Sequence, residues 1–282
     1  MPEGQRGSYM INYVNNAYDK VLKPCDAQRF SIIINSQETE KHILGHRGGD
    51  AKAKAKLPAL TYMGVLDSEK YRKHLDQCKE QGTKPQGSRR AEFMRPTGLL
   101  MLDFDHVGDQ AQTQAPLSSP QGGKTPTDAI DSPVKLWEFI KSRYDAIAKD
   151  MSSPLGGSEG GSGGPGAIAL AHITPSGDGL RVVVKRTKGT TIEQEQYEWC
   201  KAMRLDAIGV KPDAACKDIS RLSFAPMQSE VLYYNPSLLF AELPEASDYP
   251  DGTLWGGDSL RATLGTPPPL QGTPSINRGG VC

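Results

Sequence analysis

Two apolar, β-branched runs on either side of a Pro-Ser-Gly-Asp-Gly turn constrain the fold of this chain more than any other feature. The segment reads AIALAHITPSGDGLRVVVKR and covers residues 167–186. Apolar runs that are joined by Gly and Asp turn residues are typical of a β-hairpin. We therefore expect an antiparallel strand pair here, against which the other elements pack.

Strand-like and helical segments follow one another in mixed order along the rest of the chain. Further strands are predicted over 28–36, 57–65 and 98–107, at the end of 209–226, and over 230–236. Helices are predicted to start at Asp67 or Ser68, at Ser132-Pro133 and at Thr190 or Thr191, and to run to about 79, 147 and 208. Mixed order with a hairpin favours an α+β domain, with a mixed or antiparallel sheet flanked by helices.

Low-complexity segments suggest where the main domain begins and ends. Residues 108–126 read as a loop, and SSPLGGSEGGSGGPG at 152–166 reads as a flexible loop. The latter lacks the GK[ST] signature and a preceding strand, so it is not typical of a phosphate-binding loop. We expect an N-terminal helical extension at 1–27, the main domain at 28–245, and a Pro/Gly-rich tail or linker at 246–282.

Composition excludes several classes of protein. The 33 basic and 33 acidic residues balance, so a nucleic-acid surface would have to be a local patch. The five cysteines show no paired spacing, which argues against a zinc finger and against a disulfide framework. The chain shows no signal peptide and no apolar run near the roughly 20 residues that span a bilayer. We expect a soluble cytoplasmic protein with no membrane partner.

Two aspartates lie within the predicted strand GLLMLDFDHV. Asp103 and Asp105 are two residues apart, so in a strand they project from the same face. Unpaired, they would repel each other, whereas a divalent cation such as Mg²⁺ or Mn²⁺ removes that penalty. The alternative is a strand end with two solvated aspartates.

The hairpin turn is the second candidate for chemistry. Backbone N–H groups around Gly177 and Gly179, together with the Ser176 hydroxyl, can bind an anion. Arg181 adds a bidentate phosphate donor, and Lys185 lies further along the same strand. The alternative is an ordinary hairpin, since Gly-Asp-Gly is good turn chemistry by itself.

A third acidic segment, PDAACKDISR, follows near the end of the main domain. Its Asp213 or Asp218 could complete a metal site, with Arg221 shortly after them. The alternative is a surface loop with a local pair between Asp218 and Arg221, which would contribute little stability.

In this order the three segments resemble the motifs of the archaeo-eukaryotic primase superfamily, or primase-polymerases. The most similar type is the virulence-protein-E N-terminal type of bacterial mobile elements. LDFD is similar to its catalytic acidic pair, TPSGDGLR to its nucleotide-contacting motif, and PDAACKDISRLSF to its third acid with a downstream arginine. KAKLPALTYMG and YYNP are also similar to that type, and the resemblance covers roughly residues 28–240. It implies an RRM-like catalytic core and a DNA primase or primase-polymerase that acts in replication of a mobile element or plasmid.

The resemblance also implies roles for individual residues. Asp103, Asp105 and Asp213 would hold two ions of Mg²⁺ or Mn²⁺, with Asp218 as the alternative third acid. The nucleoside triphosphate would be contacted by Ser176, Gly177, Gly179, Arg181, Lys185 and Arg221.

One position departs from the family pattern. Many members have histidine where this chain has Arg181, so a role specific to histidine is in doubt, although phosphate binding is not. His172, on the preceding strand, could partly compensate, but a lone strand histidine is more often structural.

Basic residues outside the motifs are candidates for contact with a single-stranded DNA template. Lys52, Lys54 and Lys56 alternate with alanine, and Arg89 and Arg90 precede the strand with the paired aspartates. The alternative is a solvated charge run. The family also suggests a helicase module or partner.

Three other functions are compatible with the same residues. A catalytically inactive nucleotide- or single-stranded-DNA-binding module would bind without forming product. A nuclease would shorten labelled DNA rather than extend it. A structural protein with solvated aspartates would show no metal-dependent shift in melting temperature.

Overall fold

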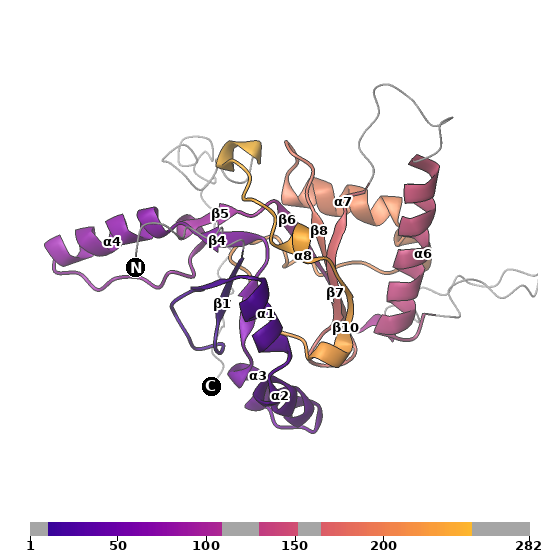
Figure 1. The fold of residues 1–282 in the computed structure, drawn as a ribbon, viewed down its shortest axis with the longest axis horizontal. Helices are drawn as coiled ribbons and strands as arrows, with labels where there is room; N and C mark the ends of the chain where they lie inside the picture. The colour runs from indigo at the N-terminus through magenta and orange to yellow at the C-terminus, as the bar shows by residue number, and fades with distance from the viewer. Residues whose placement is uncertain (1–10, 109–129, 152–164, 250–282) are drawn as a thin grey trace, which may run out of the picture.

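The computed structural model describes residues 11–108, 130–151 and 165–249. This part of the chain is an α+β structure with two four-stranded sheets and a two-stranded ribbon, and every strand pair is antiparallel (Figure 1). The predicted fold class is therefore confirmed.

The first sheet has the strand order β2-β1-β3-β9. Its strands are β1 (Ile11–Val14), β2 (Lys23–Cys25), β3 (Ala59–Thr61) and β9 (Ser223–Phe224). Beside it lie the helices α1 (Ala27–Ile34), α2 (Gln37–Arg47) and α3 (Ala53–Lys56). The ribbon consists of β4 (Gly64–Leu66) and β5 (Met94–Pro96), and α4 (Ser68–Glu80) extends away from both sheets (Figure 1).

The second sheet has the strand order β10-β7-β8-β6, so that β6 is an edge strand. Its strands are β6 (Leu99–Phe104), β7 (Ile168–Ile173), β8 (Leu180–Lys185) and β10 (Val231–Tyr234). The helices α6 (Pro133–Met151) and α7 (Ile192–Ala202) pack on it, with α6 on the side away from the first sheet (Figure 1). Short helical segments complete the described chain: Ala91–Phe93, Asp206–Ile208, Gln228–Glu230, α8 (Pro236–Leu239) and Ala246–Asp248.

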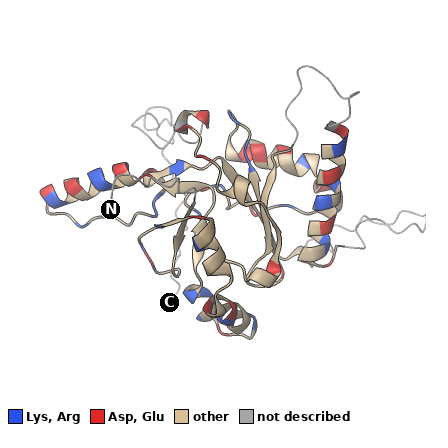
Figure 2. Cartoon of the chain, in the orientation of Figure 1, with Lys and Arg blue, Asp and Glu red and all other residues tan. Residues whose placement is uncertain are grey.

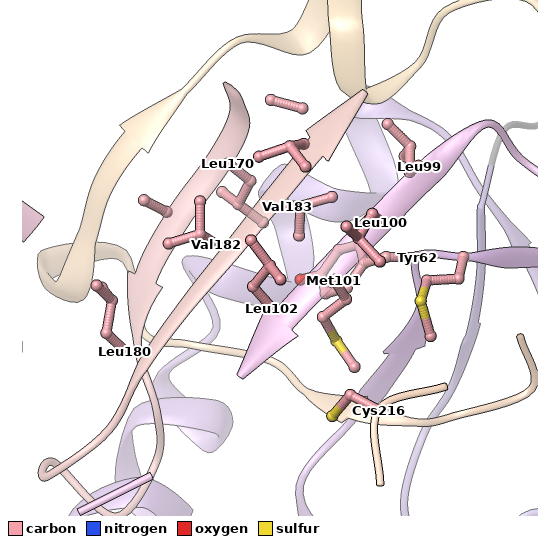
Figure 3. Packing of buried hydrophobic residues seen from close by; sticks show 14 of the residues in the cluster. Tyr62, Leu99, Leu100, Met101, Leu102, Leu170, Leu180, Val182, Val183 and Cys216 are labelled. Atoms are coloured by element: carbon pink, nitrogen blue, oxygen red, sulfur yellow. The ribbon is translucent and has the colours of Figure 1, made fainter. Parts of the chain in front are cut away.

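The second sheet forms a large part of the hydrophobic core. Every residue of β6 is buried, and β8 is buried up to Val184. Figure 3 shows the apolar side chains of β6 among Leu170, Val182 and Val183, with Tyr62 and Cys216 on the other side of β6. A strand buried on both faces reads as a continuous apolar run, which is the pattern of Leu99–Leu102.

Local capping signals placed several elements correctly. The Asp67 carboxylate accepts a hydrogen bond from Lys70 N at 3.0 Å at the start of α4. The Thr191 hydroxyl accepts one from Gln194 N at 3.1 Å at the start of α7. Because these side chains satisfy N–H groups that lack an intrahelical partner, they fix where the helices begin. The hairpin and the helix after Ser132 are also confirmed.

The N-terminal assignments were wrong. Residues 28–36 lie mostly in helix α1, because Asp26 caps it through Arg29 N at 2.7 Å and Phe30, Ile33 and Ile34 form a buried helical stripe. The expected helical extension at 1–27 instead contributes β1 and β2 to the first sheet. Its residues 1–10 lie outside the described part.

Other boundaries also differ from expectation. The predicted strand at 57–65 is two short strands, β3 and β4, and the helix expected to reach 208 ends at Ala202. Tyr249 is buried, and the Arg186 guanidinium lies over its ring, with Arg186 Cζ 4.5 Å from the ring centroid. The domain therefore continues past residue 245. Nearly all of the loops expected at 108–126 and 152–166, and residues 250–282 of the tail, lie outside the described residues.

Charge is mixed over the described surface. Basic and acidic side chains are interleaved along α4 and α6 (Figure 2). Among the helices that the structure describes, none combines the length and the apolar character needed to cross a membrane.

Candidate active site

A row of three polar side chains crosses the second sheet. Asp103 on β6 pairs in register with Arg181 on β8, which pairs with His172 on β7. Directly opposed residues of an antiparallel sheet share one face. That face is turned toward the first sheet, because Arg181 Nη1 donates a 2.7 Å hydrogen bond to the hydroxyl of Ser223 on β9. The row therefore lies at the junction of the two sheets.

Asp103 and Arg181 form a buried ion pair. Arg181 Nη2 donates to Asp103 Oδ2, and the two residues are 7% and 3% exposed. Burial alone would lower the pKa of Arg181, but the neighbouring Asp103 carboxylate raises it above the usual value. Asp103 Oδ1 is buried and has no hydrogen-bond partner. Arg181 thus holds Asp103 through Oδ2, and Oδ1 can still accept a hydrogen bond or bind a cation.

Asp105 lies just beyond the end of β6 and is exposed. The expected strand therefore ends between the two aspartates, with one carboxylate buried and the other near solvent. The pKa of Asp105 is raised by partial desolvation, then by the negative charge of Asp103, with a smaller contribution from Asp213. Arg181 opposes this shift. The three acids are close enough to repel one another.

The loop around Asp213 runs along the open edge of β6. Asp213 N donates a 2.7 Å hydrogen bond to Asp103 O, which fixes the third acid beside the first. The thiol of Cys216 lies 4.0 Å from Asp103 Oδ2 and from Asp213 Oδ2. Burial, with help from Asp103, raises the pKa of Cys216 to about 11, so its thiol is neutral near pH 7. Arg221 Nη2 lies 3.4 Å from Asp213 Oδ2.

Asp218, the alternative third acid, has a local role in its loop. Its Oδ1 accepts hydrogen bonds at 2.8 Å from Ser220 N and from the Ser220 hydroxyl, and the residue is exposed. The pair expected between Asp218 and Arg221 is replaced by the contact of Arg221 with Asp213. Of the two candidates, Asp213 is the one that the fold brings to Asp103.

The hairpin turn lies against the end of β6. Val107 N donates to Asp178 O at 3.0 Å, and His106 Nδ1 lies 2.7 Å from the Asp178 carboxylate. Gly177 has a φ of +89°, which L residues rarely adopt. The hydroxyl of exposed Ser176 lies 2.9 Å from that of Thr174. The predicted anion-binding turn and the paired acids are therefore adjacent.

Two residues that brace this turn were missed from the sequence. Arg47, the last residue of α2, donates from Nε to Pro175 O at 2.9 Å and from Nη2 to Thr174 O at 3.3 Å. Its guanidinium also pairs with Glu230 at 2.7 and 2.8 Å. A Cβ on Gly177 would lie 3.1 Å from Arg47 Nε, so the glycine permits this approach. The contact joins residues 128 apart in sequence, and no local pattern marks it.

Lys185 lies far from the hairpin turn, and His172 is buried beneath the surface of the site. Lys185 pairs with Leu99 at the other end of β8, four residues from Arg181, or about 13 Å along a strand. His172 is fully buried, and its Nδ1 lies 2.9 Å from Ile173 O. Burial, and then the Arg181 charge, lower the pKa of His172 to about 3. It is neutral near pH 7 and supplies no positive charge for a phosphate.

The basic residues on α3 are accessible. Lys52, Lys54 and Lys56 are all exposed. Lys54 Nζ lies 5.8 Å from the ring centroid of Phe224 on β9, so α3 lies beside the strand that carries Ser223. These lysines remain candidates for contact with a nucleic-acid backbone.

The two arginines before the ribbon have structural partners instead. Arg89 Nη1 donates at 2.9 Å to Ala17 O and to Asp19 O, which ties this loop to the first sheet. Arg90 Nε lies 3.3 Å from Glu92 Oε1. Arg89 is therefore committed to backbone carbonyls and is the weaker candidate for nucleic-acid contact.

The acids suit a hard divalent cation in type and charge. Carboxylate oxygens are the ligands that Mg²⁺ and Mn²⁺ prefer, and a cation would relieve the repulsion that raises the pKa of Asp105. Among the described residues no three His, Cys, Asp or Glu side chains are already grouped to hold an ion. Binding would therefore require the carboxylates to turn toward one another, with Asp103 Oδ1 as the available buried oxygen.

The fold and site define an α+β protein with an acidic cluster at the junction of two antiparallel sheets. No family model matches the chain, and no curated protein or solved structure shows significant similarity to it. The case for a function therefore depends on the geometry of the site.

Proposed function

We propose that the chain is a DNA primase or primase-polymerase that joins nucleotides on a single-stranded DNA template during replication of a mobile element or plasmid. The observation that carries the proposal is the hydrogen bond from Asp213 N to Asp103 O beside the hairpin turn. It brings a third carboxylate to a paired set of acids, next to backbone N–H groups that suit a triphosphate.

The acids Asp103, Asp105 and Asp213 would hold Mg²⁺ or Mn²⁺. Such ions lower the pKa of the attacking hydroxyl and neutralise charge on the phosphates. Gly177 N already donates to Thr174 O at 2.8 Å, so the Ser176 hydroxyl and the other N–H groups of the turn would bind the phosphates of the incoming nucleotide. Arg47 keeps the turn in place through Thr174 and Pro175. The chain thus contributes positioning and charge, which are the main requirements of this chemistry.

Arg181 acts mainly through Asp103. As a direct phosphate donor it would have to leave both Asp103 and Ser223, and leave a buried carboxylate unpaired. Its guanidinium, on the neighbouring strand β8, instead holds the Asp103 carboxylate in place. Arg221, exposed beside Asp213 on the side away from the turn, would contact only those phosphates that extend across the acids.

The template and the partners follow from the same reaction. The exposed lysines of α3 would contact the backbone of the single strand, and a helicase module or partner would expose that strand. Binding through such lysines weakens as salt rises.

The proposal is tested by primer extension and primer synthesis on single-stranded DNA with Mg²⁺ or Mn²⁺. Asp105→Asn is the most informative variant, because Asp105 is exposed and its loss should leave the fold intact. We expect it to lower the rate by about 100-fold or more. Asp213→Asn should behave likewise, whereas Asp218→Asn should retain activity. Equal extension by wild type and Asp105→Asn would refute the proposal, and metal-dependent shortening of the DNA would indicate a nuclease.

A catalytically inactive nucleotide- or single-stranded-DNA-binding module is the second candidate. It is favoured by the Asp103–Arg181 ion pair, which occupies one oxygen of a proposed metal ligand. This candidate expects binding of a nucleoside triphosphate with no product in either metal.

A further inference from the structure

A cleft of about 470 Å³ lies between α7 and the loop that carries Asp213. Tyr197 and Lys201 of α7 form one wall, and Val210, Pro212 and Ala214 of the loop form the other. A volume of this size is typical of small-ligand sites. Pro212 and Ala214 are the chain neighbours of Asp213, although Asp213 itself does not line the cleft.

The cleft and the hairpin turn lie on opposite sides of the acids. β6 is an edge strand, with β8 and its turn along one side. The other side is occupied by the Asp213 loop, through the hydrogen bond from Asp213 N to Asp103 O. A triphosphate on the turn would therefore leave the Asp213 side open to a second reactant.

The walls of the cleft combine an aromatic ring with charged side chains of both signs: Lys201, Lys211 and Lys217, with Glu193 and Asp206. Tyr197 is 64% exposed, although its ring is large and apolar. Lys201 Nζ lies 5.7 Å from the centroid of that ring, and Lys217 also lines the cleft, where it pairs with Glu193 at 2.5 Å. An accessible aromatic face beside lysines is the chemistry that binds a nucleobase and its phosphate in single-stranded nucleic acid.

We propose that this cleft binds the terminal nucleobase of the strand whose hydroxyl attacks the incoming nucleotide, with the base stacked on Tyr197. This inference rests on the proposed function, and it adds the place of the second reactant. Nucleotidyl transfer needs two reactants that meet at the acids, and the turn can hold only one of them. Protein partners also cover exposed tyrosines, but the three lysines and the position of the cleft along the loop that carries Asp213 favour a nucleic acid.

The experiment measures affinity without chemistry. Fluorescence anisotropy of a labelled single-stranded oligothymidylate in EDTA gives Kd for wild type and variants. Tyr197→Ala should raise Kd about 5- to 150-fold, the range for loss of one stacked base. Tyr197→Phe keeps the ring and should stay within about twofold of wild type. Tyr18→Ala removes a tyrosine that is 74% exposed but lies on the first-sheet side, and should leave Kd unchanged.

Kinetics then separate this inference from the proposed function. If the protein extends primers, Tyr197→Ala should raise KM for the primer and leave KM for the nucleoside triphosphate unchanged. Primer extension with an unchanged primer KM in Tyr197→Ala would overturn the cleft alone. Tyr197-dependent oligonucleotide binding without any product would overturn the polymerase and support the cleft as a nucleobase site. Absence of oligonucleotide binding by wild type would overturn the cleft.

Discussion

The buried Asp103–Arg181 ion pair gives a quantitative test of the site. Arg181→Leu leaves a carboxylate that is 3% exposed without its cation, and also removes the hydrogen bond to Ser223. Breaking a buried pair from one side destabilises a protein by about 3–5 kcal/mol. For a domain of this size that loss lowers Tm by roughly 6–20 °C.

A second pair in the same site serves as the control. Arg221 and Asp213 have side chains that are 43% and 30% exposed, so solvent screens them. Arg221→Leu should cost about 0–1 kcal/mol. The double variant Asp103→Leu/Arg181→Leu removes both buried charges and should be more stable than Arg181→Leu alone. Urea unfolding in EDTA, followed by tryptophan fluorescence, measures all of these variants. Equal losses for Arg181→Leu and Arg221→Leu would refute the argument that burial decides the energy.

Two further predictions concern pH and the hairpin turn. The folded pKa of His172 is about 3, below the ordinary value of about 6.5, so between these pH values the unfolded chain binds a proton that the folded chain does not. The free energy of unfolding therefore decreases as pH falls through this window, by up to about 1.4 kcal/mol per pH unit. In urea unfolding at several pH values, His172→Gln should show a weaker dependence of the free energy of unfolding on pH than wild type. Equal pH dependence in the two proteins would contradict this. Gly177→Ala should be destabilised by more than Gly189→Ala in the same assay. Both glycines have positive φ, +89° and +80°, but only Gly177 would bring a Cβ against Arg47, so equal losses would show that Arg47 does not constrain the turn.

Local signals in the sequence predicted those elements whose determinants are local. The Gly-Asp-Gly turn between two apolar runs gave the β7–β8 hairpin, and Asp67 and Thr191 marked two helix starts. The error at α1 has a local cause as well. The β-branched run Ile32–Ile34 suggested a strand, whereas Asp26 and the helical spacing of Phe30 and Ile33 decided the outcome.

Strand pairing between segments that are distant in sequence could not be predicted from local signals. β1 and β2 are only 4 and 3 residues long, and they are strands because β1 pairs with β2 on one side and with β3 on the other. Three or four residues carry too little alternation to predict a strand. The helical assignment failed there because tertiary contacts override weak local preference.

In the site, too, local features could be predicted from the sequence and contacts between distant segments could not. The sequence placed Asp103 and Asp105 on or beside a strand and the turn at its hairpin, but proximity between Asp213 and Asp103 depends on a backbone hydrogen bond across the fold. The bracing of the turn by Arg47 spans 128 residues and was not predicted. Arg181 was expected to face a phosphate, but the register of β8 with β6 sets it opposite Asp103.

The register of β8 with β6 affects the electrostatic repulsion among the three acids. Arg181 compensates Asp103 from the neighbouring strand β8, but Asp103 Oδ1 has no hydrogen-bond partner and the pKa of Asp105 stays raised. Asp105 is exposed and Asp213 is half-buried beside Arg221, so the accessible side of the site is the one toward these two acids. An added cation is attracted to that side and does not need to displace the buried arginine. Under the proposed function, Arg181 is then a permanent counter-ion of Asp103, and contact with the phosphates is left mainly to the turn.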